Sequence, residues 1–131
     1  MSDQNWDVIV VGGGNAAFCA ALAAREQGAS VVMLEAAPED EAGGNSAFTA
    51  GAMRVAYDGV EDILKLVPDL SETEIETTDF GTYTQDQFFD DMARVTQYRA
   101  DPDLVETLVT QSLDTLIWMQ KKGVRFVPIY G

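Results

Sequence analysis

The fold is decided by residues 7–17, which read Asp7-Val8-Ile9-Val10-Val11-Gly12-Gly13-Gly14-Asn15-Ala16-Ala17. The β-branched residues before the glycines are typical of a buried parallel strand, and the glycines allow a tight turn into a helix. In a dinucleotide-binding fingerprint of this kind, Gly12 permits the turn and Gly14 lets the backbone approach a pyrophosphate. Ala17 replaces the third glycine of the fingerprint, and its single methyl group still lets the helix lie close to the strand.

A second strand is expected over residues 30–35, which read Ser-Val-Val-Met-Leu-Glu. An alanine-rich helix joins the two strands and is expected to end at Gly28. Glu35 stands about twenty residues after the glycines, where a carboxylate accepts hydrogen bonds from a ribose and repels a 2′-phosphate. The pattern therefore predicts a nucleotide-binding βαβ unit that disfavours NADP. The alternative is a glycine turn between strand and helix that binds nothing.

A second glycine-rich segment covers residues 43–53, which read Gly-Gly-Asn-Ser-Ala-Phe-Thr-Ala-Gly-Ala-Met. Small side chains let backbone amides and hydroxyl groups come within hydrogen-bonding distance of a large flat or charged ligand. Taken alone, the segment is also compatible with a flexible loop.

Together the two glycine segments resemble the amino-terminal part of the fumarate reductase and succinate dehydrogenase flavoproteins, in which a Gly-Gly-Asn-Ser/Thr-x-x-Ala-x-Gly-Gly segment stands at this distance. Thr49 replaces the usual alanine of that motif, and Ala52 replaces its last glycine. The resemblance implies an α/β fold with a Rossmann-like FAD-binding βαβ unit, an incomplete doubly wound parallel sheet and additional helices. It also implies that residues 1–131 form the amino-terminal part of an FAD-binding domain, truncated before the capping domain and the rest of the FAD domain.

The resemblance implies FAD as the cofactor, held noncovalently, because family members with covalent flavin carry a histidine where this chain has Asn45. The sequence contains no histidine at all. The residues expected to bind the cofactor come from both glycine segments and from the end of the second strand: Gly12, Gly14, Asn15, Ala16, Ala17, Glu35, Gly44, Asn45, Ser46, Thr49, Ala50 and Gly51.

The activity implied by the resemblance is that of an FAD-dependent oxidoreductase, which moves a hydride between flavin and a carbon-carbon bond of a di- or tricarboxylate such as fumarate, succinate or tricarballylate. Residues 88–96 and 99–101 resemble the corresponding region of tricarballylate dehydrogenases. A ketosteroid-type flavin dehydrogenase and a non-catalytic FAD- or NAD-binding module are the alternatives. Catalytic residues are expected beyond Gly131, so these 131 residues alone are expected to be inactive, and the electron donor or acceptor is left open.

The charge balance restricts the partners. Asp and Glu number 22 against 8 Lys and Arg, giving a formal net charge of -14, which disfavours nucleic acid and anionic membrane surfaces. Without histidine, no metal site is expected. The apolar stretches are too short to span a membrane, and a cytoplasmic location is expected.

In the carboxy-terminal half, Thr84 and Gln87 predict a capping box that opens a helix over residues 86–97. Its inner face is expected to carry Phe88, Phe89, Met92 and Val95.

Asp101 and Pro102 open a further helix that is expected to continue to Gly123. Its apolar repeat predicts core positions at Leu104, Val105, Leu108, Val109, Leu113, Leu116 and Ile117. Residues 124–129 are a candidate edge strand because Pro128 interrupts them. Residues 55–81 receive no assignment.

Overall fold

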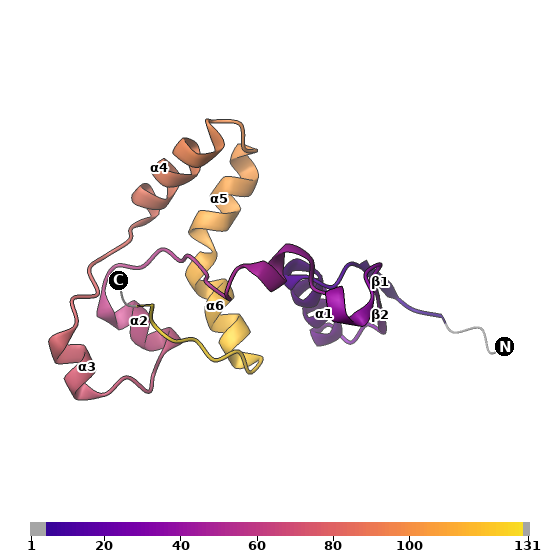
Figure 1. The fold of residues 1–131 in the computed structure, drawn as a ribbon, viewed down its shortest axis with the longest axis horizontal. Coiled ribbons are helices and arrows are strands. Elements are labelled where there is room, and N and C mark those ends of the chain that lie inside the picture. The colour runs from indigo at the N-terminus through magenta and orange to yellow at the C-terminus, as the bar shows by residue number, and fades with distance from the viewer. Residues whose placement is uncertain (1–4, 130–131) are drawn as a thin grey trace. The chain divides into compact units, whose positions relative to one another are not determined.

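The computed structural model describes residues 5–129, and the chain divides between Met53 and Arg54 into two compact units (Figure 1). We call the part up to Met53 the glycine unit and the part from Arg54 onward the helical unit. Among the described residues, no helix is long and apolar enough to cross a membrane.

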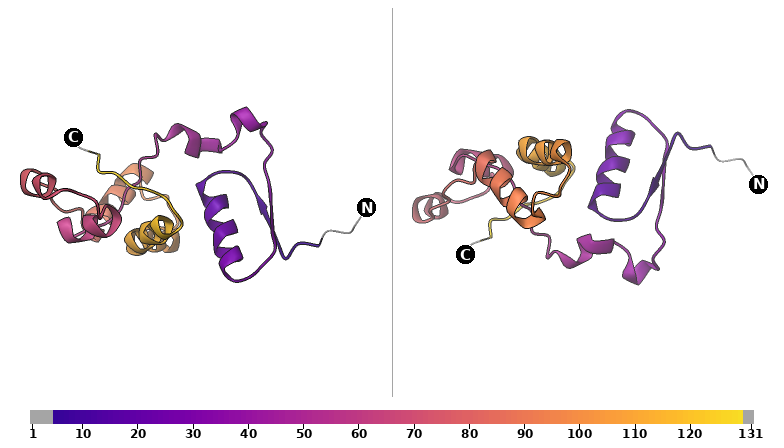
Figure 2. Two further views of the ribbon diagram at one scale, coloured as in Figure 1. Left: turned by 90° about the horizontal axis from the view of Figure 1, so that it is seen from below. Right: turned by 90° about the horizontal axis from the view of Figure 1, so that it is seen from above.

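The glycine unit is a parallel strand pair connected by one helix. β1 (Val8–Val11) pairs in parallel with β2 (Val31–Leu34), so that Val8 lies opposite Val31 and Val11 opposite Leu34. Helix α1 (Asn15–Glu26) packs on both strands, and Figure 2 shows it lying alongside them. The βαβ unit expected from the sequence is therefore confirmed, as is the α/β fold class.

The ends of these elements differ slightly from the expected ones. Helix α1 ends at Glu26, and Gly28 follows with a φ of +85°, as expected for a glycine just past a helix end. Strand β2 begins one residue later and ends one residue earlier than expected, and Ser30, just before β2, is bound to Asp7, just before β1. The Asp7 Oδ2 atom accepts from Ser30 N at 2.8 Å and from Ser30 Oγ at 2.6 Å. These bonds, led by that of the Ser30 hydroxyl, lower the pKa of Asp7.

Two short 3₁₀ helices complete the glycine unit. The first, η1 (Glu39–Glu41), lies in the acidic linker after β2. The second, η2 (Gly44–Phe48), follows Gly43 and makes up the first part of the second glycine-rich segment, so this part is a helical turn and not an irregular loop.

The helical unit contains five helices among its described residues: α2 (Val60–Leu66), α3 (Glu72–Thr77), α4 (Gln85–Thr96), α5 (Pro102–Thr110) and α6 (Ser112–Lys121). Helices α4 and α5 form an antiparallel pair (Figure 1). Helices α2 and α3 occupy the region that the sequence left unassigned. The capping box of Thr84 and Gln87 is confirmed, and Ser71 and Glu74 form a second one at α3.

Two apolar clusters stabilise the helical unit. The first is centred on Ala56, Phe88 and Val109, of which Val109 is fully buried. The second contains Leu66, Val67 and Leu116.

The single long helix expected from residue 102 to Gly123 is wrong, since it is broken between α5 and α6. Gln111 leaves the helical conformation with a ψ of 4°, and the next residue, Ser112, is buried. The Ser112 hydroxyl donates to Val109 O at 2.9 Å and accepts from Ala56 N at 3.1 Å. A tertiary hydrogen bond thus fixes the point at which the helix is interrupted.

Three expected core positions are exposed. Val95 on α4 is 64% exposed, and Leu104 and Leu108 on α5 are 69% and 45% exposed. Helical spacing places these side chains beside the apolar face, but none of the described elements of the helical unit covers them. The edge strand expected over residues 124–129 is also wrong, because no strand of the helical unit is available to pair with this segment over the described residues.

Candidate functional site

The first glycine segment forms a tight turn from β1 into α1. Gly12 has a φ of +122°, which favours glycine, and its N–H donates to Leu34 O at 2.7 Å. Gly14 is the N-cap of α1 and carries no side chain to cap the helix. The amino end of α1 therefore presents backbone N–H groups and the positive end of the helix dipole, an arrangement that attracts anions.

The three glycines of the turn leave different amounts of room for a side chain. A Cβ atom on Gly13 would lie 2.5 Å from Glu35 Oε2, and one on Gly14 would lie 3.3 Å from Ser46 Oγ. A Cβ on Gly12 would meet the Cβ of Ala17 at 3.8 Å, which is an ordinary contact. The alanine in the third position of the fingerprint is therefore compatible with the packing of α1 on β1.

Glu35 follows directly after β2 and lies against the glycine turn. Its Oε1 atom accepts from Ala37 N at 2.9 Å, which holds the carboxylate in place, and the side chain is exposed. The parallel pairing of β1 and β2 brings this acid beside Gly13.

The second glycine segment meets the first at the amino end of α1. Ser46 Oγ accepts from Asn15 N at 3.0 Å, so the serine caps a helix to which it does not belong. Thr49 Oγ1 donates to Ser46 O at 3.1 Å and accepts from Gly51 N at 3.3 Å. Between them Ala50 adopts a φ of +53°, a left-handed conformation that costs a non-glycine residue about 1–2 kcal/mol.

The structure thus brings part of the expected residue set together and leaves the rest nearby. Gly14, Asn15 and Ser46 converge at the amino end of α1, and Ala16 and Ala17 lie in its first turn. The other expected residues of the second segment lie in or beside η2: Gly44, Asn45, Thr49, Ala50 and Gly51.

Two residues of this region were missed by the sequence reasoning. A Cβ atom on Gly13 would come closer to a neighbouring side chain, that of Glu35, than one on Gly12 or Gly14 would. The run of three glycines in the sequence could have indicated that Gly13 is also constrained. Phe48 is 88% exposed at the end of η2, and it is the only aromatic residue in the small-residue segment 43–53.

A family model described as "FAD binding domain" matches residues 7–130. The chain belongs to the FAD-binding domain family. FAD is the ligand of this family, so the expectation of FAD as the cofactor is confirmed, and the match covers both glycine segments.

The chain is also similar in sequence to several enzymes. Over 117 residues the chain is 32% identical to a fumarate reductase (cytochrome) of Shewanella frigidimarina, covering 89% of this chain and 18% of the relative. It is 28% identical to an NADH:acrylate oxidoreductase of Vibrio harveyi, covering 95% and 16%. A 3-oxosteroid 1-dehydrogenase of Mycolicibacterium smegmatis is 41% identical over 68 residues, covering 47% and 12%. The chain spans less than a fifth of the length of each of these relatives. The family model and the similarity to the fumarate reductase confirm the resemblance to the fumarate reductase family.

The residues of the glycine unit fit FAD. The Gly13 and Gly14 positions form a cradle that a Cβ atom would fill, and the amino end of α1 suits a pyrophosphate. The Glu35 carboxylate is an exposed acceptor beside that cradle, as a ribose diol requires.

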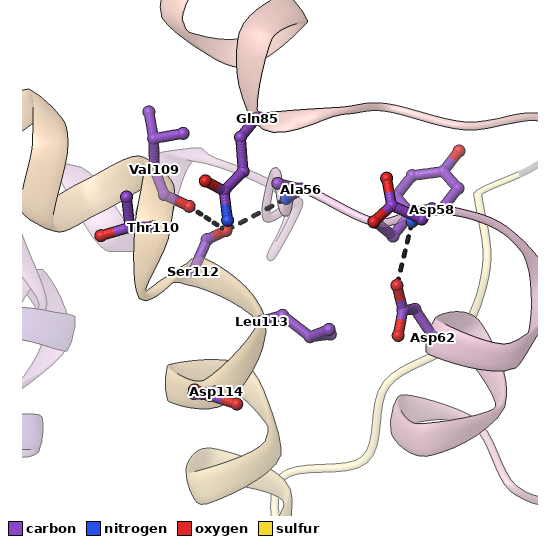
Figure 3. Close-up of a pocket in the computed structure, with 10 residues that line it drawn as sticks. Ala56, Asp58, Asp62, Gln85, Val109, Thr110, Ser112, Leu113 and Asp114 are labelled. Carbon is purple, nitrogen blue, oxygen red and sulfur yellow. Dashed lines mark hydrogen bonds between the residues drawn. The ribbon is translucent and has the colours of Figure 1, made fainter.

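The helical unit contains a separate pocket of about 200 Å³ (Figure 3). Asp58, Asp62 and Asp114 line it, together with the backbone around Ser112. Three carboxylates repel an anion, so this pocket is unsuited to a pyrophosphate or to a carboxylate substrate. In the part of the chain from residue 5 to 129, no group of three or more acidic or cysteine side chains is placed to hold a metal ion.

Proposed function

We propose that the protein is an FAD-dependent oxidoreductase that holds FAD noncovalently in its glycine unit. The observation that carries this proposal is the convergence of both glycine segments at the amino end of α1, through the hydrogen bond from Asn15 N to Ser46 Oγ. The arrangement places two segments rich in small residues at the amino end of one helix. A dinucleotide with a flat ring system at one end is long enough to contact both segments.

The proposed roles follow from where the residues lie. The N–H groups of Ala16 and Ala17 bind the pyrophosphate, for which Gly12 and Gly14 leave room, while the Asn15 N–H keeps its bond to Ser46 Oγ. Glu35 accepts hydrogen bonds from the adenosine ribose.

The second segment lines the path toward the isoalloxazine ring. Its proposed contacts are Gly44, Asn45, Ser46, Thr49, Ala50 and Gly51. Asn45 cannot form the flavin linkage that a histidine forms, so the attachment is noncovalent.

Bound FAD supplies hydride transfer to or from a carbon-carbon bond, and the protein supplies position and electrostatics. We propose a small di- or tricarboxylate as substrate, with fumarate, succinate or tricarballylate as examples. The names of the fumarate and acrylate reductases among the relatives support a small unsaturated acid. The electron partner is not assigned, and a cytoplasmic location is part of the proposal, in keeping with the acidic charge and the single cysteine.

A second candidate, a ketosteroid-type flavin dehydrogenase, is favoured by one observation. The 3-oxosteroid 1-dehydrogenase shares 41% identity with this chain, although over only 68 residues. This candidate keeps the same cofactor and the same reaction type but takes an apolar substrate.

The test combines cofactor release with turnover. Acid precipitation of the purified full-length protein should leave a yellow supernatant, whereas colour in the pellet would contradict noncovalent attachment. The protein with a reduced dye should then reduce fumarate, or with an oxidised dye should oxidise tricarballylate. Turnover of a 3-oxosteroid instead would favour the second candidate. Bound FAD with no turnover of any of them would indicate a binding module without chemistry.

A further inference from the structure

An uncovered aromatic side chain lies in the second glycine segment. Phe48 is the last residue of η2 and is 88% exposed, more than any other large apolar side chain in the described part of the chain. Its neighbours Ala47 and Thr49 are small and leave the ring uncovered. The ring is therefore free to contact a ligand of the glycine unit.

The backbone that carries this ring is fixed within the glycine unit. Ser46 Oγ accepts from Asn15 N at 3.0 Å, which holds η2 at the amino end of α1. Thr49 Oγ1 donates to Ser46 O at 3.1 Å and accepts from Gly51 N at 3.3 Å, which ties down the chain directly after Phe48. A side chain on a fixed backbone has less conformational freedom to lose when a ligand covers it.

The geometry of η2 decides on which side Phe48 projects. Ser46 is turned toward the first glycine segment, since a Cβ atom on Gly14 would lie 3.3 Å from Ser46 Oγ. In a 3₁₀ helix the side chains of residues i and i+3 lie above one another, so Phe48 shares its side of η2 with Asn45. Both residues are exposed, so this side of η2 is open.

We propose that Phe48 packs against the dimethylbenzene ring of the isoalloxazine and so positions the flavin end of FAD. The inference rests on the proposed function, which places Asn45 along the path toward the isoalloxazine. The dimethylbenzene ring is the apolar end of the isoalloxazine, and two aromatic rings attract one another when they are offset or meet edge to face. ADP lacks this ring, so binding of the adenosine half does not depend on Phe48.

The first experiment compares FAD with ADP as ligands of the flavin-free full-length protein. Phe48→Ala should weaken FAD binding by about tenfold, equivalent to about 1.4 kcal/mol, and leave ADP affinity unchanged. Phe18→Ala is the matched control, because Phe18 on α1 is another exposed phenylalanine of the glycine unit. The control should change neither affinity.

The second experiment reports the contact directly. Phe48→Trp keeps an aromatic ring and should retain most of the FAD affinity. An indole that touches the isoalloxazine quenches its fluorescence by donating an electron to the excited flavin. FAD bound to Phe48→Trp should therefore be several-fold dimmer than FAD bound to the wild-type protein, whereas Phe18→Trp should leave the fluorescence unchanged.

The outcomes separate this inference from the proposed function. Unchanged FAD affinity in Phe48→Ala, equal losses of FAD and ADP affinity, or undiminished flavin fluorescence in Phe48→Trp would each overturn the inference. In all three cases FAD still binds, so the proposed function stands. If Phe48→Ala fails to fold, the fluorescence of Phe48→Trp decides. A wild-type protein that binds ADP but no FAD would contradict the proposed function itself.

Discussion

The glycine unit and the helical unit differ in how much of their apolar surface is buried. In the glycine unit the strands are short and their apolar side chains are largely uncovered: Ile9 is 61% exposed and Val11 82% exposed. In the helical unit, α4 and α5 begin at well-formed caps and enclose apolar clusters that contain the fully buried Val109. The comparison shows that the recognisable ligand motif lies in the part with the smaller core, and most of the buried apolar surface in the part without the motif.

The two units also differ in what determines the residue types at their key positions. In the glycine unit, backbone geometry and close approach determine the residue types, as at Gly12 and Gly13. In the helical unit, side-chain hydrogen bonds such as that from Ala56 N to Ser112 Oγ connect distant segments. Substitutions at the glycine turn should therefore affect ligand binding, and substitutions in the apolar clusters of the helical unit should affect the free energy of unfolding.

The largest expected effect is on the core of the helical unit. Phe88→Ala should lower the free energy of unfolding by about 3–5 kcal/mol, because the ring is 4% exposed and packs against Val109 and Tyr83. Urea unfolding followed by circular dichroism measures the loss. Val95→Ala on the same helix is the control and should change the stability by no more than about 0.5 kcal/mol. Equal losses in the two variants would contradict the assigned burial.

The next effect concerns the contact between Gly13 and Glu35. Glu35→Ala should weaken FAD binding by about 1.5–3 kcal/mol, the range for hydrogen bonds to a charged group. Gly13→Ala should have a similar effect, because the new Cβ displaces the carboxylate, while stability changes little. The double variant should lose no more than Glu35→Ala alone, since both changes remove one interaction.

Flavin fluorescence titration measures these affinities. Glu39→Ala, at another exposed acid of the same unit, removes the same charge and should leave FAD affinity unchanged. Additive losses in the Gly13 and Glu35 double variant would mean that Gly13 acts independently of Glu35.

A smaller effect is expected at Ser46. Ser46→Ala removes the acceptor of the Asn15 N–H and should destabilise α1 by about 1 kcal/mol, the usual contribution of a helix cap. Hydrogen exchange at the Asn15 amide should become faster, which measures the loss of the cap directly. Ser46→Thr keeps a hydroxyl and should retain the protection. Unchanged exchange in Ser46→Ala would show that the two segments do not meet in solution.

The smallest effect is a pH dependence at the start of the strand pair. The folded-state pKa of Asp7 is lowered by Ser30, so its contribution to stability is present above the ordinary value of 3.8 and is lost as the pH falls through the folded pKa. Asp7→Asn should remove this contribution and flatten the acid side of the stability profile. Unfolding curves recorded between about pH 2 and 5 test this, and identical profiles would contradict it.

The sequence predicted those features whose signals lie close together along the chain. The strand, the glycines and the acid of the βαβ unit occur within residues 7–35, and the capping box of Thr84 and Gln87 lies within one helical turn. Each pattern has a local physical cause, so it could be recognised without the fold. The role of both glycine segments in binding one cofactor was expected only through the family resemblance, and the hydrogen bond between them was not expected.

The features that were missed depend on distant contacts. The break at Gln111 follows from the bond between Ser112 and Ala56, which are 56 residues apart. Arg54 and Asp91 are 37 residues apart, and neither residue alone suggests a pair. Helical periodicity indicated a face for Val95 and Leu104 but could not show that no other element covers it.

The central claim is that the glycine unit binds FAD by its adenosine half and without a covalent bond. The most direct test is a titration of the flavin-free full-length protein with FAD, followed by displacement with ADP. FAD should bind, ADP should release it into solution, and riboflavin, which lacks the adenosine and the pyrophosphate, should not compete at the same concentration. Displacement by riboflavin but not by ADP, or no binding of FAD at all, would contradict binding through the adenosine half.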